Sequence, residues 1–152
     1  MTVLLIVHGL LAVALLGAIT HQAVAVWWPA RAHAGSFVER FRAVPSTSYV
    51  AAVVVLYAAT VLFGAVIYTH YTITARIVLI QLQMWKPYGL FEMKEHFAAI
   101  GLGVLPAYWY FWRQPASPQD ARVRAFLTAI LAFVVWWNFL VGHIVNNVRG
   151  FS

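Results

Sequence analysis

Four long, nearly uncharged stretches constrain the fold of this chain more than any other feature of its sequence. They run over about 3–28, 49–71, 93–112 and 123–148, and short polar segments separate them. Each has roughly the 20 apolar residues that a helix needs to cross the hydrocarbon core of a bilayer. We therefore predict an all-α fold, an integral membrane four-helix bundle that runs up and down, in a single domain over residues 1–152.

The composition indicates that lipid, rather than water, surrounds most of the chain. Hydrophobic residues make up 63% of it and charged residues only 9%, whereas a soluble domain carries roughly 25% charged residues. The net charge of +6 comes mainly from arginines in the short loops. It indicates contact with lipid head groups and a cytoplasmic loop face rather than nucleic-acid binding. The chain has no cysteine, which excludes iron–sulfur clusters and thiolate zinc sites.

The connecting segments carry local signals for where the helices end. Trp27 and Trp28 form an interfacial anchor, and Pro29 ends the first span. The segment GSFVERFRAV can form a short surface helix. The segment TITARIVLIQLQMW either extends the second helix beyond the membrane or lies along the interface. Pro87 and Gly89 then predict a turn before the third span.

The distribution of basic residues predicts the orientation. The side that holds the first and third loops carries six Lys or Arg, and the opposite side carries four; the six are Arg31, Arg40, Arg42, Arg113, Arg122 and Arg124. Cytoplasmic loops are the more basic ones. We therefore predict a multi-pass protein of the cell inner (plasma) membrane with both termini on the non-cytoplasmic side.

The histidines are the most informative residues about function. Up-and-down folding brings His8, His70, His96 and His143 toward the membrane face that holds the termini, one from each span. Histidine is rare inside membrane spans and usually marks a functional site there. The set of four therefore predicts a cofactor or metal site near this face, with His70, at the membrane edge, the weakest member.

Helical spacing predicts which side of the third span faces inward. His96 shares a face with a stripe of small residues, Ala99, Gly103 and Ala107, which permits close approach of another helix. Glu92 lies one turn before His96 on the same face. We therefore expect His96 to point into the bundle.

The two other histidines do not extend this site. His33 is a loop residue that we expect at the surface, and His21 points into the protein about 20 Å from His8 along the helix. His8 and His21 also lie about 140° apart around an ideal helix. We therefore do not expect this helix to supply one ligand to each of two stacked haems, and we predict at most one haem.

Three interpretations of the site remain open from the residues alone. The first is a b-type haem bound by His8, His96, His143 or His70 in an electron-transfer subunit, linked to quinone and to other membrane or redox subunits. Such a subunit would be part of an oxidoreductase without a complete active site of its own. The second is a cofactor-free accessory subunit. The third is a membrane metal-binding or transport protein whose metal is held by His96, His143, His8 and Glu92.

The architecture resembles that of small membrane cytochromes b, including the bacterial four-helix group and the membrane anchors of respiratory dehydrogenases. The segments that carry the resemblance are VHGLL around His8, MKEHFAAIGLG around His96 and FLVGHIVNN around His143. The resemblance extends over the whole chain at the level of architecture. It implies a haem b and electron transfer within the membrane, and it assigns no role to an individual residue.

Overall fold

The computed structural model describes residues 1–29, 35–115 and 117–150, and every element of secondary structure in them is a helix. Four helices are long: α1 (Thr2–Trp27), α3 (Val50–Ile73), α5 (Trp85–Arg113) and α6 (Pro118–Gly150). The short ones are α2 (Phe37–Arg42), the 3₁₀ helix η1 (Ser46–Tyr49) and α4 (Ala75–Gln81). Each predicted span therefore coincides with a long helix.

Three of the helical segments are apolar and long enough to cross a membrane: Thr2–Trp27, Ser46–Ile73 and Pro118–Val145. These lengths and compositions identify a membrane protein surrounded by lipid. The fourth long helix, α5, is not among them; it carries Lys86, Glu92, Lys94 and Glu95 in its first half.

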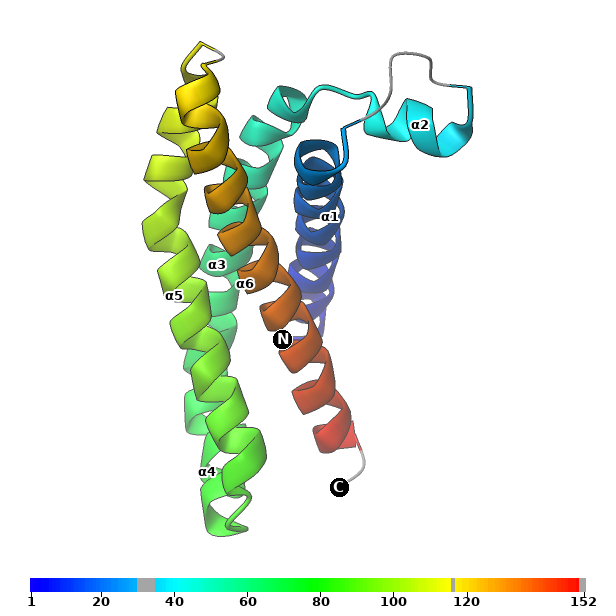
Figure 1. The fold of residues 1–152 in the computed structure, drawn as a ribbon. Helices are drawn as coiled ribbons and strands as arrows, with labels where there is room; N and C mark the ends of the chain where they lie inside the picture. The colour runs from blue at the N-terminus through cyan, green and yellow to red at the C-terminus, as the bar shows by residue number, and fades with distance from the viewer. Residues whose placement is uncertain (30–34, 116, 151–152) are drawn as a thin grey trace.

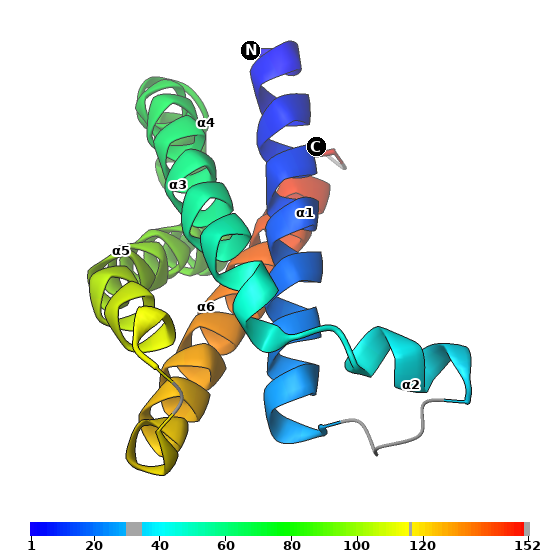
Figure 2. The same ribbon diagram turned by 90° about the horizontal axis from the view of Figure 1, so that it is seen from above.

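The long helices pack around one another in the order α1, α3, α5, α6. α1 contacts α3 and α6, and α5 contacts α6 and α3. Seen from above, α1 and α5 lie on opposite sides of the molecule (Figure 2). Helix α4 lies at one end of the molecule, together with the C-terminal end of α6 (Figure 1). We call this the terminal end, because the N-terminus of α1 also points that way. The other end holds α2 and the turn between α5 and α6.

The hydrophobic core fills the half of the molecule away from the terminal end. Its buried members come from all four long helices; they are Leu15, Ile19, Val50, Val53, Tyr57, Leu105, Tyr108, Trp112, Leu131, Val134 and Val135. One buried polar side chain in this half connects three elements. The buried Gln22 donates to the Ser46 carbonyl at 3.1 Å and accepts a hydrogen bond from the Tyr108 hydroxyl. These bonds connect α1 to η1 and α5.

The connecting segments confirm one prediction and correct another. The predicted surface helix in GSFVERFRAV is α2, which begins with a capping box between Ser36 and Glu39. The turn predicted at Pro87 and Gly89 is wrong, because both residues lie inside α5. Pro87 is the third residue of that helix, where the missing N–H would have no partner in the helix anyway. The chain instead turns at Leu82–Met84, where Gln83 has a φ of 54°.

Candidate pocket at the terminal end

A cavity of about 500 Å³ lies between α1, α3, α5 and α6 in the half of the molecule nearer the terminal end. This volume falls in the range of ~300–1,000 Å³ that is usual for small-molecule and cofactor sites. Five of the residues that line the cavity have no side chain or only a methyl group, and each long helix supplies at least one of them: Gly9, Ala12, Gly64, Ala98 and Gly142. The small size of these residues therefore leaves a broad space between the helices, which larger side chains would fill.

His8 of α1 and His143 of α6 both line this pocket. The His8 ring packs against α3: a Cβ added to Gly64 would stand 3.3 Å from its Cε1 atom. The ring also lies beside the backbone of Thr60. Its Nδ1 atom is buried and has no hydrogen-bond partner among the described residues. His143 is exposed on the side of the pocket that α6 forms.

Two further lining residues bury polar atoms that have no hydrogen-bond partner in the described part of the chain. They are the hydroxyl of Tyr71 and the Oδ1 atom of Asn138. Tyr71 is only 4% exposed. Buried polar groups in native proteins are nearly always paired, so several unpaired ones around one cavity indicate that partners are missing. A ligand with its own polar groups supplies such partners.

Lys94 and Glu95 place charges in the same pocket. The Lys94 Nζ donates to Glu95 Oε1 at 2.6 Å, and the two side chains are 15% and 29% exposed. The pocket wall is otherwise mainly apolar, with residues such as Leu5, Ile67 and Phe139. The site thus combines a large apolar cavity with one charged pair.

His96 does not reach the pocket, so the prediction that it points into the bundle is wrong. Its side chain is exposed, and its Nδ1 atom lies 2.7 Å from the Glu92 carbonyl of its own helix. Gly103 and Ala107 are exposed as well, and a Cβ on Gly103 would meet no atom within 4 Å. The face of α5 that packs inward is instead formed by Gly101, Leu105, Tyr108 and Trp112.

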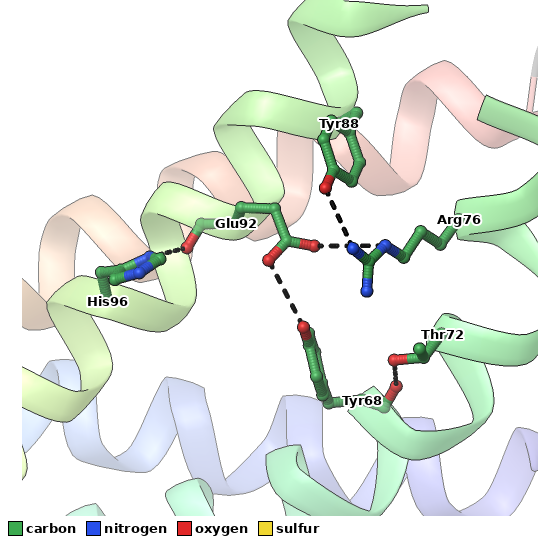
Figure 3. A network of polar contacts seen from close by, with 6 residues as sticks. All are labelled: Tyr68, Thr72, Arg76, Tyr88, Glu92 and His96. Atoms are coloured by element: carbon green, nitrogen blue, oxygen red, sulfur yellow. Dashed lines mark hydrogen bonds and ion pairs between the residues drawn. The ribbon is translucent and has the colours of Figure 1, made fainter. Parts of the chain in front are cut away.

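Glu92 and His70 also lie away from the pocket lining. Glu92 accepts a hydrogen bond from Tyr68 at 3.3 Å and lies 4.0 Å from the Arg76 guanidinium, which donates to the Tyr88 hydroxyl at 3.1 Å (Figure 3). The hydrogen bond to Tyr88 raises the pKa of Arg76. This network connects α3, α4 and α5. His70 is exposed at the end of α3, as predicted for a residue at the membrane edge.

His21 lies away from the site. His21 is buried at 3% exposure and stacks on Tyr49, with the ring centroids 4.2 Å apart, in the core half of the molecule. His33 lies outside the described residues. Among the described residues, no group of three or more His, Asp or Glu side chains could hold a metal ion. This finding does not favour the metal set that the sequence suggested around Glu92.

Sequence reasoning missed the contributions of Tyr71, Lys94 and Asn138. Tyr71 and Lys94 each lie close in sequence to a histidine, and Asn138 is a polar residue within an apolar span, which is the signal that could have identified it.

Comparison with known proteins adds no relative. No protein family, no curated protein and no solved structure matches this chain. The functional argument therefore depends on the pocket itself.

Proposed function

We propose that the protein is a membrane-embedded electron-transfer subunit that binds haem b in this pocket, with His8 as one ligand of the iron. The observation that carries the proposal is the environment of the His8 ring. A histidine that binds a metal usually donates its other ring N–H to a carboxylate or a backbone carbonyl. The Thr60 backbone lies beside the His8 ring and can accept such a bond from the other ring nitrogen, and the Nδ1 atom is buried without a partner among the described residues. In that tautomer Nδ1 carries the lone pair that a metal requires.

His143 is the second proposed ligand, because it lines the same pocket from α6. Two neutral imidazoles from different helices of a bundle can hold a b-type haem. The small residues Gly9 and Gly142 support this assignment, since they are next to the two histidines in the chain and line the pocket without filling it. When bound, a haem supplies a one-electron couple whose potential its ligands and surroundings set.

The membrane setting that goes with this function is a four-span, up-and-down bundle in the inner membrane. α5 is the additional span; its segment from His96 to Trp112 carries no Asp, Glu, Lys or Arg. Both termini would face the non-cytoplasmic side, because the opposite end holds six of the ten basic residues. The pocket then lies toward the non-cytoplasmic face.

A single haem needs one partner that donates electrons to it and one that accepts them. We propose that these are a quinone and another subunit of a larger respiratory or redox complex. The exposed outer face of α5 supports a subunit contact, because it presents His96, Gly103 and Tyr110 rather than a uniformly apolar surface.

A visible absorption spectrum tests the proposal. Protein purified from a haem-sufficient host should show a low-spin b-type spectrum. His8→Ala and His143→Ala should each abolish the low-spin form, whereas the matched change His96→Ala should leave it intact, because His96 lies outside the pocket. Added imidazole should restore the spectrum of His8→Gly by occupying the vacated ligand position.

A colourless protein with no bound iron would refute the haem assignment. The accessory-subunit interpretation would then be the better one. Loss of the spectrum in His96→Ala, with retention in His8→Ala, would mean that the ligands lie on the outer face of α5, contrary to the proposal.

A further inference from the structure

Lys94 and Glu95 form an ion pair in the wall of the pocket. Both line the cavity, and among its described lining residues they are the only Asp, Glu, Lys or Arg side chains. The Lys94 Nζ donates to Glu95 Oε1 at 2.6 Å, and the two side chains are 15% and 29% exposed. An ionisable residue within a membrane span is costly and usually has a function. The position of this pair therefore indicates a function in the pocket.

The Lys94 ammonium group has a defined position because several groups contact the side chain. Besides its bond to Glu95, the Nζ atom lies 4.9 Å from the centroid of the Phe91 ring. The aliphatic part of the side chain extends toward α6, since a Cβ on Gly142 would lie 3.8 Å from its Cδ atom. Gly142 directly precedes His143, so Lys94 reaches the side of the pocket that holds the second proposed ligand.

Both charges of the pair also act on His8, the proposed iron ligand on α1. Lys94 and Glu95 each have an electrostatic effect on the His8 ring, and the effect of Lys94 is the larger of the two. The two effects have opposite signs, because one charge is positive and the other is negative. The pair therefore produces a net positive potential at His8. Away from water such a potential is weakly screened.

We propose that the Lys94–Glu95 pair, through the dominant positive charge of Lys94, raises the reduction potential of the haem in this pocket. This inference rests on the proposed function. A ferric haem carries one positive charge more than a ferrous one, so a positive potential at the iron ligand favours the ferrous state. Lys94 supplies this effect, and the negative charge of Glu95 reduces it.

A redox titration of the haem absorption in detergent tests the role of the pair. Lys94→Met should lower the reduction potential, whereas Glu95→Gln should raise it, because it removes the charge that opposes Lys94. Each change should alter the ratio of ferrous to ferric haem at a fixed ambient potential by on the order of tenfold, or about 59 mV for one electron. The potential of the double variant should lie between those of the single variants.

The controls separate an effect of charge from a change of structure. Lys94→Arg keeps the charge and should keep a potential close to that of wild type. Lys86→Met, which removes an exposed lysine at the same end, should change nothing. All these variants should retain the low-spin spectrum.

Two results would overturn the role of the pair: shifts of the same sign in Lys94→Met and Glu95→Gln, or no shift in either variant. If Lys94→Met does not fold, the nearly isosteric Glu95→Gln still decides, because its potential must rise. A wild-type protein without a His8-dependent low-spin spectrum would refute the proposed function, and this inference with it.

Discussion

Gly101 and Gly103 are two residues apart on α5 but have opposite surroundings. A Cβ on Gly101 would clash with the Tyr57 hydroxyl and lie 3.0 Å from Val134, whereas a Cβ on Gly103 would meet nothing within 4 Å. The Tyr57 hydroxyl cannot easily move away, because it donates to the Ala98 carbonyl at 2.9 Å and the residue is 3% exposed. Only Gly101 is thus required by the packing of α5 against α3.

We predict that Gly101→Ala lowers the free energy of unfolding by about 1–3 kcal/mol through overpacking. Gly103→Ala is the matched control and should leave the stability unchanged or raise it by up to about 1 kcal/mol, because Ala is the better helix former and its Cβ meets no neighbour there. Unfolding in detergent micelles, followed by circular dichroism, measures both. If Gly103→Ala were instead the less stable variant, the face of α5 that carries Gly103 would be the one that packs inward.

This pair of glycines also shows which part of the site could not be predicted. In a soluble helix the polar face identifies the outside, but a helix in lipid is apolar on both sides. Small residues occur on both faces of α5, and the sequence contains nothing that distinguishes Gly101 from Gly103. His8, by contrast, could be singled out from the sequence and does line the pocket, because a polar residue within an apolar span is costly unless it faces the interior of the bundle.

At the scale of elements, the turn between α5 and α6 depends on one arginine. Arg124 is 8% exposed and donates to three backbone carbonyls at the end of α5, those of Phe111, Gln114 and Pro115, at 2.8–2.9 Å. The last carbonyls of a helix have no partner within it. The guanidinium also lies 5.7 Å from the centroid of the Trp112 ring. Arg124 therefore fixes how α6 returns along α5.

We predict that Arg124→Lys destabilises the protein by about 1–3 kcal/mol, because an ammonium group cannot reproduce the planar set of donors and would leave buried carbonyls unpaired. Arg122→Lys, at an exposed position two residues earlier, should be neutral. Thermal unfolding of the two variants at equal detergent concentration distinguishes these outcomes. Equal melting temperatures would show that the three carbonyls find other partners.

The existence of the four long helices was predictable from hydropathy, while several of their ends were not. Apolar runs of this length have few alternatives in lipid, since the helix satisfies its own backbone. The start of α5 was misplaced because Pro87 and Gly89 commonly mark turns, yet a proline in the first turn of a helix costs no hydrogen bond. The actual turn depends on the positive φ of Gln83, and glutamine gives no local signal for it.

At the scale of the whole molecule, packing and binding are divided between the two ends. Most of the core cluster lies in the half with α2 and the α5–α6 turn, and most of the pocket lies in the half with the terminal end; Leu15, Tyr57 and Val135 belong to both. Substitutions in the core half should therefore change stability, whereas conservative substitutions around the pocket can change ligand binding alone. If the proposed haem is bound, a loss of its spectrum in a pocket variant with unchanged stability can therefore be attributed to the ligand site.

The proposed four-span topology predicts on which side of the membrane each connecting segment lies. Reporter domains fused after Ser36 and after Ser117 should be found on the same side of the membrane, and a reporter fused after Gln83 on the opposite side. The fusion after Gln83 interrupts the turn between α4 and α5 rather than a helix. Reporters after Gln83 and Ser117 on one side would mean that α5 does not cross, and the four-span arrangement would be wrong.

The buried amide of Gln22 has a consequence for the order of events during synthesis. Its two partners, the Ser46 carbonyl and the Tyr108 hydroxyl, follow it by 24 and 86 residues. At ~5–20 residues per second, Tyr108 leaves the ribosome roughly 4 to 17 seconds after Gln22. An unpaired amide in hydrocarbon costs several kcal/mol. We therefore expect the end of α1 that carries Gln22 to stay near water or a polar surface of the insertion machinery until α5 has been made.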